Sequence, residues 1–197
     1  DAAAKGNVVI RGWGATQILR PVRHVPCVRI MRPFEKRVEW LMAQLDTDDR
    51  ELAESEIRRS DPANATRMHD PFGLQCGDPV LFDLVLNTDR LSIDTCAQLI
   101  KDLLQRPEFA PTDESMRALR GMALSAHVRG ALAGHAQTHA VDVTIESVDG
   151  RVTLRGIVMN DGERQAAANV CAAVAGVREV DNQLRVMRRS RTSGAMQ

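Results

Sequence analysis

Residues 79–106 read PVLFDLVLNTDRLSIDTCAQLIKDLLQR, an apolar run followed at once by a helical pattern. The first part, 79–88, has the composition of a buried strand. In the second part Ser92 stands where a helix N-cap is expected, and leucines such as Leu99 and Leu103 share one side of the helix. A continuous apolar strand that leads into a helix is typical of a parallel sheet with both faces covered. The stretch therefore predicts an α/β fold.

The residues before this stretch show the same alternation of strand and helix patterns. NVVI at 7–10 and VPCVRIM at 25–31 are predicted to be strands, and helical patterns occupy 34–45 and 49–60. Together with the opening stretch they form a predicted first domain, residues 1–106.

The sequence changes character near RPEFAPTDES, where two prolines interrupt the helical pattern. We place a linker at 107–115 and a second domain at 116–187, which leaves a basic, disordered tail at 188–197. The second domain has a helical pattern at 116–134, followed by alternating apolar and polar residues on both sides of Asp149-Gly150, a strong hairpin signal.

A helix at 161–176 and a last strand at 177–186 complete the predicted order of elements, α-β-β-α-β. Three strands backed by two helices form a small α+β domain that buries one face of its sheet.

Composition limits the classes of partner and compartment. The 197 residues contain 26 basic and 26 acidic side chains, so no net charge attracts the chain to nucleic acid or to anionic membranes. The four cysteines form no C-x-x-C pair, which argues against a zinc cage or a disulfide framework and favours a cytoplasmic protein. No apolar run reaches the roughly 20 residues of a membrane span. Because the chain begins with Asp1, we expect an upstream part.

The second domain resembles the BON domain, a small bacterial module. The resemblance is carried by VDGRVTLRGIV (148–158), by the alanine-rich ERQAAANVCAAVAGV (163–177) and by VREVDNQLRV (177–186). Gly156 is interpreted as a strand glycine where a helix packs closely or where the strand bulges, and Asn182 as a polar residue at a strand start. The resemblance implies a binding module without chemistry of its own, which contacts a protein partner or a membrane surface.

The first domain resembles the cytidylate kinase-like branch of the nucleoside monophosphate kinases. The resemblance is carried by AAKGNVVIRGWGATQIL (3–19), VRIMRPFEKRVEWLM (28–42), ELAESEIRRSDPANATR (51–67) and DPFGLQCGDPVLFDLVLNTDRLSIDTCAQLI (70–100). It implies part of the parallel sheet of a P-loop kinase with flanking helices. However, the phosphate loop G-x-x-x-x-G-K-[ST] occurs nowhere in these residues.

The glycine-flanked segment after NVVI is the first candidate nucleotide site. The family places a phosphate-binding arginine at a position that is Trp13 here, and Arg11 lies two residues earlier on the same face of an extended strand. Trp13 either fills the vacated pocket as core or stacks on a flat ligand. Gly12 and Gly14 would permit close backbone approach.

The second candidate site is the segment SDPANATRMHDPFG, residues 60–73. The resemblance implies that arginines follow Asp61 here and close over the transferred phosphoryl group. Asn64, His69 and Asp70 stand at these positions, and Arg67 alone remains nearby. The candidate nucleotide-binding residues are thus Arg11, Gly12, Trp13, Gly14, Asp61 and Arg67, with no catalytic residue and no metal ligand.

Three functions remain open. The first is a non-catalytic regulatory or scaffold protein in which the degenerate kinase-like domain is a platform and the BON domain recruits a partner. The second is a CMP kinase that uses ATP and Mg²⁺, which requires an upstream phosphate loop; otherwise we expect no cofactor. The third is a ligand-gated protein that binds CMP or another nucleotide without turnover. A sheet without its phosphate-loop strand would expose its edges, so we also expect a homo-oligomer or a partner segment.

Overall fold

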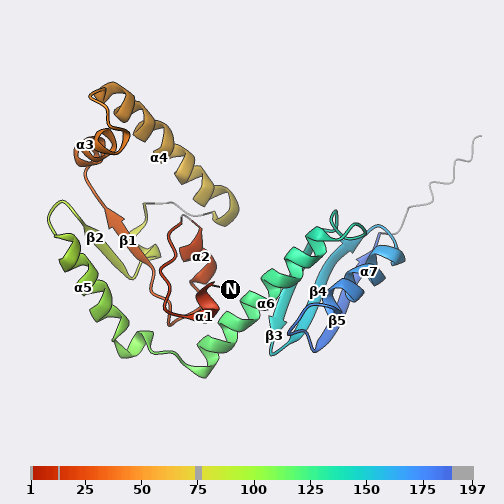
Figure 1. Ribbon diagram of the computed structural model, residues 1–197. Coiled ribbons are helices and arrows are strands. Elements are labelled where there is room, and N and C mark those ends of the chain that lie inside the picture. Colours follow the sequence, from red (N-terminus) through yellow and green to blue (C-terminus); the bar gives the residue numbers. More distant parts are fainter. Residues whose placement is uncertain (1, 13, 74–76, 188–197) are drawn as a thin grey trace, which may run out of the picture. The chain divides into compact units, whose positions relative to one another are not determined.

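The computed structural model describes residues 2–12, 14–73 and 77–187, with the backbone alone described at 67–72. The chain divides into two compact units (Figure 1). The N-terminal unit is Asn7–Ser115, and the C-terminal unit begins at Met116 and includes the residues before Asn7. Each unit has a hydrophobic cluster of its own.

A parallel pair of strands is the centre of the N-terminal unit. Strands β1 (Val28–Met31) and β2 (Leu84–Asn87) pair in parallel register. Helix α5 (Ile93–Leu104) follows β2, and the hydroxyl of Ser92 accepts the N-cap hydrogen bond from the Thr95 amide at 3.1 Å. The α/β class and the helix start are confirmed.

Strand β2 is shorter than the apolar run that predicts it. Residues Pro79–Leu81 form a short 3-10 helix, η1. Proline cannot donate to a strand ladder, and the Asp78 carboxylate accepts a hydrogen bond from the Val80 amide, which stabilises the turn instead.

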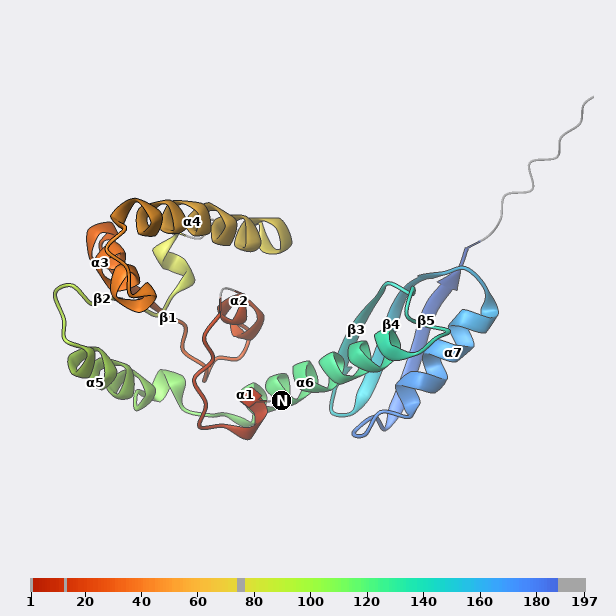
Figure 2. The same ribbon diagram turned by 45° about the horizontal axis from the view of Figure 1, so that its top comes forward.

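Between the two strands the chain forms a helical hairpin (Figures 1 and 2). Helix α3 (Phe34–Leu45) has the predicted bounds, and helix α4 (Arg50–Phe72) continues well beyond its predicted end. The two helices pack through Val38, Ala53 and Ile57, which are all buried.

The strand predicted at 7–10 is wrong. The chain there has no regular structure, and it lies between two short helices, α1 (Ala2–Lys5) and α2 (Ala15–Leu19). Val9 is 95% exposed. A β-strand exists only beside a neighbour that accepts its backbone hydrogen bonds, and no described strand offers its edge to this segment.

The C-terminal unit has the predicted order of elements. After a short 3-10 helix η2 (Pro107–Phe109), the elements are α6 (Asp113–Gly134), β3 (Val143–Val148), β4 (Arg151–Val158), α7 (Asp161–Ala172) and β5 (Glu179–Val186). Strand β4 lies in the middle, antiparallel to β3 and parallel to β5. Both helices lie on the same face of the sheet (Figures 1 and 2).

The hairpin signal at Asp149-Gly150 is confirmed. Both residues have positive φ, 48° and 82°, as a type I′ turn requires. Gly156 also has a positive φ, 150°, and a Cβ there would lie 3.0 Å from the carbonyl oxygen of Asp142. The close approach predicted at Gly156 is thus made by the chain entering the neighbouring strand, not by a helix.

The core of the C-terminal unit lies between the helices and the sheet. Val152, Leu154 and Val158 of β4 meet Val128 of α6 and Cys171 of α7, all of them buried. Helix α7 provides the crossover that two parallel neighbouring strands need.

A glycine on α6 permits the close packing of this helix on the sheet. A Cβ at Gly121 would overlap with the backbone carbonyl oxygen of Ser147, whereas a Cβ at Gly130 on the same helix would meet nothing within 4 Å. We expect Gly121→Ala to lower the free energy of unfolding by about 1–3 kcal/mol, because backbone must move. Gly130→Ala should raise it by up to about 1 kcal/mol through helix propensity. Urea denaturation followed by circular dichroism measures both, and equal shifts would contradict the close packing.

Candidate functional site

The carboxyl ends of β1 and β2 lie at one edge of the parallel pair, where ligands of α/β proteins commonly bind. The carbonyl oxygen of Met31 accepts hydrogen bonds from the Thr88 amide at 3.0 Å and the Thr88 hydroxyl at 3.2 Å. The Asn87 side chain accepts one from the Asp89 amide at 3.0 Å. The Met31–Thr88 hydrogen bonds therefore hold the carboxyl ends of β1 and β2 together.

The amino ends of the strands are also tied together. The Asp83 carboxylate accepts a hydrogen bond from the Cys27 amide at 2.7 Å, and the Asp83 amide donates one to the Cys27 carbonyl at 2.8 Å. Burial, with the charge of Asp83, raises the pKa of the Cys27 thiol. Cys27 is therefore a structural thiol rather than a nucleophile.

The structure leaves the glycine segment open. Arg11 is exposed, and a Cβ at Gly12 would meet nothing within 4 Å. Gly14 precedes the first turn of α2 and gives it no side-chain cap. Trp13 lies outside the described residues. Arg11 does not follow a strand here, so the strand geometry predicted for this segment is wrong.

The carboxylate of Asp61 is engaged within the hairpin. Arg37 of α3 donates two hydrogen bonds to it, Nη1 to Oδ2 at 2.8 Å and Nη2 to Oδ1 at 2.6 Å. These hydrogen bonds lower the pKa of Asp61 and raise that of Arg37, while partial burial opposes both shifts. A bidentate pair of this kind fixes α4 against α3. The structure joins Asp61 to Arg37 and not to Arg11.

Among the described side chains of α3 and α4, every arginine contacts a carboxylate. Arg50 pairs with Glu35 and with Glu54, and Arg58 lies 3.8 Å from the same Glu54. Arg59 pairs with Glu56 at 2.5 Å, and Arg58 also lies over the ring of Phe34, 4.5 Å from its centroid. Arg67 belongs to α4, but its side chain lies outside the described part of the chain.

The sequence analysis did not identify Arg37 as the partner of Asp61. A signal was available, because two consecutive helices joined by a short turn must run antiparallel. Residues on either side of the turn, such as 37 and 61, then face each other across the hairpin. The opposite charges at these positions would have suggested the pair.

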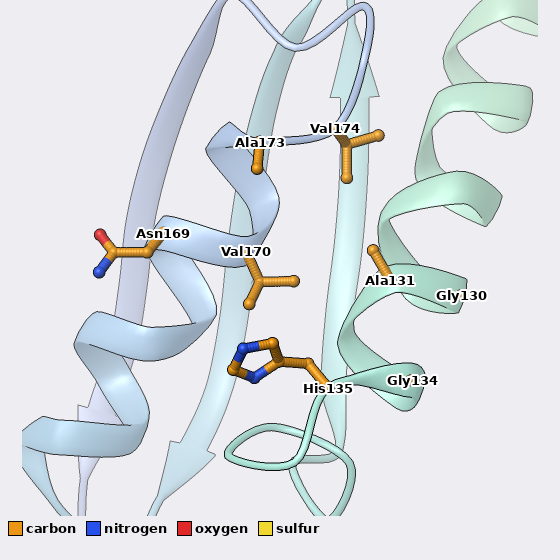
Figure 3. A pocket seen from close by; sticks show the side chains of 8 residues that line it. All are labelled: Gly130, Ala131, Gly134, His135, Asn169, Val170, Ala173 and Val174. Atoms are coloured by element: carbon orange, nitrogen blue, oxygen red, sulfur yellow. The ribbon is translucent and has the colours of Figure 1, made fainter.

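The C-terminal unit contains a shallow groove of about 550 Å³ between α6 and α7 (Figure 3). Its floor is made of small and apolar side chains: Ala131 of α6, Val170 of α7, and Ala173 and Val174, which follow the end of α7. Gly130 and Gly134 lie beside them. The imidazole of His135 extends from the end of α6 toward Val170, whereas the Asn169 amide points away from the groove (Figure 3). The groove contains no charged side chain.

Asn182 connects α7 to β5 rather than starting a strand. Its amide nitrogen donates to the Arg164 carbonyl at 3.0 Å, and its oxygen accepts from the Leu184 amide at 3.2 Å. The conspicuous polar residue of the last strand is thus structural.

Comparison with known proteins agrees with both resemblances. Residues 1–90 match the model of the cytidylate kinase-like family, and residues 123–188 match that of the BON domain. The first part of the chain is thus similar to the cytidylate kinase-like family and the second part to the BON domain. Curated relatives named cytidylate kinase include one from Staphylothermus marinus, 26% identical over 54% of this chain and 59% of its own length. Another, from Pyrobaculum islandicum, is 30% identical over 53% of this chain and 55% of its own.

The chain therefore spans little more than half the length of the cytidylate kinases it matches. Within the described residues, no three His, Cys, Asp or Glu side chains gather as metal ligands would. No helix in that part of the chain is long and apolar enough to cross a bilayer.

The Arg37–Asp61 pair predicts a pH-dependent contribution to stability. We expect Asp61→Asn to lower the free energy of unfolding by about 0.5–1 kcal/mol at pH 7, the value of a well-formed exposed pair. Because the pKa of Asp61 is lowered in the folded state, its contribution is present above the ordinary aspartate pKa. It is lost as the pH falls through the lowered value. The difference between wild type and variant should therefore shrink in acid.

Urea titrations from pH 7 to pH 3 measure this difference, and Asp48→Asn in the turn of the same hairpin is the matched control. A loss that is the same at every pH, or equal in the two variants, would contradict the role given to the pair.

Proposed function

We propose that this chain is a non-catalytic regulatory or scaffold protein. Its cytidylate kinase-like unit serves as a ligand-sensing platform, and its BON domain binds a partner. The proposal rests on the charge of the hairpin formed by α3 and α4. Residues 34–61 contain five Lys and Arg but nine Asp and Glu, a net charge of −4.

Phosphoryl transfer concentrates negative charge on the transferred group, so its catalysts surround that group with cations. Among the described side chains of the hairpin, each cation already contacts a carboxylate. Arg37 is held by Asp61, and Arg50 is shared by two glutamates. An acidic surface with paired arginines repels a nucleoside triphosphate rather than clamping it, which supports loss of catalysis.

Binding a nucleotide without turnover requires fewer cationic groups than phosphoryl transfer does. Arg11 is exposed and has no ion pair among the described residues, and Gly12 beside it leaves the backbone accessible. One guanidinium and open backbone amides suffice to hold a monophosphate such as that of CMP. Arg11, Gly12 and Gly14 are the groups of this platform that we propose contact nucleotide, with Trp13 as a stacking surface.

The BON domain supports a binding role that involves no chemistry. The charges on the outer face of its sheet are matched: Arg155 pairs with Glu146 at 2.6 Å and Arg151 with Glu179 at 3.3 Å. A face with balanced charges offers little attraction to anionic lipid. This favours a protein partner over a membrane surface.

One observation favours CMP kinase as a second candidate. Large apolar side chains beside the parallel pair are exposed, such as Ile30 and Val85, as they would be in a unit that a further segment completes. A phosphate loop supplied by such a segment would bring ATP and Mg²⁺. The described residues contain no group that could replace that loop.

Calorimetric titration with CMP and with ATP, beside a coupled assay of phosphoryl transfer, tests the proposal. We expect saturable CMP binding without turnover, and a gain in stability of about 2.7 kcal/mol when CMP is at a hundredfold excess over its dissociation constant. Arg11→Ala should weaken CMP binding about tenfold or more, because a charge-assisted hydrogen bond is lost.

Arg106→Ala is the matched control, since Arg106 is an exposed arginine next to η2 and distant in sequence from the glycine segment. Turnover would overturn the non-catalytic assignment and establish the kinase. No binding of either nucleotide would remove the sensing role, and equal weakening by both variants would show that Arg11 is not the phosphate ligand.

A further inference from the structure

The groove between α6 and α7 is shaped by small side chains. Its floor consists of Ala131, Val170, Ala173 and Val174. A Cβ at Gly130, which lies beside the floor, would meet nothing within 4 Å. Longer side chains at these positions would fill the space between the two helices. All the lining residues belong to α6, to α7 or to the turns that follow them, so the shape of the groove is set within the C-terminal unit.

A helix ends at each end of this groove. Helix α6 ends at Gly134, whereas α7 runs the other way and ends beside Ala173 (Figure 3). The carbonyl oxygens of Gly134, Val170 and Ala173 accept no hydrogen bond from any other described residue. The last carbonyl groups of a helix carry the negative end of its dipole. Both ends of the groove therefore attract a positively charged hydrogen-bond donor.

No side chain of the groove supplies that charge, because none of the lining residues is charged. The imidazole of His135 provides a neutral donor instead. Its Nδ1 accepts a hydrogen bond from the Gln137 amide at 3.3 Å, so the proton of the neutral ring is on Nε2. This N–H can donate to a carbonyl oxygen of a bound peptide backbone. The groove thus combines an apolar floor, acceptors at both ends and one donor at its side.

We propose that this groove binds a segment of the partner protein that places an apolar side chain on the floor and a lysine or arginine at each end. The proposal rests on the partner-binding role given above to the BON domain. A shallow groove buries too little of a small molecule to hold it, whereas a chain segment continues beyond the groove and contacts its rim. The apolar side chain provides most of the affinity, and the two cations select the sequence.

Nuclear magnetic resonance titration of the labelled full chain with short synthetic peptides tests this chemistry. One probe has two leucines flanked by lysines, a second has the leucines flanked by glutamates, and a third has two serines flanked by lysines. We expect the first probe to shift the amide resonances of residues 130–135 and 169–174 saturably. It should bind about tenfold or more tightly than the other two, which lack either the charge or the apolar anchor.

Two neighbouring substitutions locate the site. Ala173→Arg places a long cationic side chain in the groove, whereas Ala172→Arg places the same side chain on an exposed residue that does not line it. Arginine is favourable near a helix C-terminus, so both variants should fold. Ala173→Arg should weaken binding of the lysine–leucine probe about tenfold or more. Ala172→Arg should weaken it less than about threefold, because solvent screens the exposed charge.

Equal weakening by both variants would overturn the proposal, as would equal affinity for the glutamate probe. Binding that maps to the acidic hairpin at 34–61, or no saturable shift at all, would also overturn it. So would phosphatidylglycerol vesicles that shift the groove resonances where no peptide does, since the groove would then face a membrane. The titration with CMP uses none of these probes, so failure here removes the groove as the partner site and leaves the ligand-sensing role standing.

Discussion

The parallel pairing of β1 with β2 is the constraint on which the rest of the N-terminal unit depends. Parallel strands cannot be joined by a tight turn, so the chain between Met31 and Leu84 must return to the end from which it started. It does so through the α3–α4 hairpin. Asp83 at the start of the pair and Thr88 at its end fasten the two strands to each other. The hairpin is thus a consequence of the pairing, and the site residues it carries are placed by it.

The same pairing explains why the two units expose such different surfaces. A parallel sheet is normally buried on both faces and continues on both sides, and two strands cannot provide that. Ile30 and Met31 remain exposed as a result. The C-terminal unit needs only one cover, because one face of its mixed sheet is polar and solvated while α6 and α7 close the other. In the described residues of the N-terminal unit, the sheet has exposed apolar side chains on β1. In the C-terminal unit, α6 and α7 cover the apolar face of the sheet.

The electrostatics of the α3–α4 hairpin support the proposal that this unit does not catalyse phosphoryl transfer. A phosphate-binding surface keeps its arginines uncommitted until the ligand arrives, because a cation already paired has little to offer a phosphate. Here Arg37 and Asp61 saturate each other, and Glu54 contacts two arginines. The pairing stabilises the contact between α3 and α4, and it leaves these arginines less able to bind a phosphoryl group.

The sequence predicted a structural feature correctly where that feature depends on a few adjacent residues. Ser92 marked the start of α5, and Asp149-Gly150 identified the hairpin of the C-terminal unit, because caps and type I′ turns depend on a few adjacent residues. The Arg37–Asp61 pair was missed, since it depends on how two helices face each other. The strand prediction at residues 7–10 was wrong for a related reason. NVVI satisfies each local criterion for a strand, but a strand also requires a neighbour, and nothing within four residues can specify one. A segment whose pattern and surroundings disagree in this way is where a missing partner should be sought.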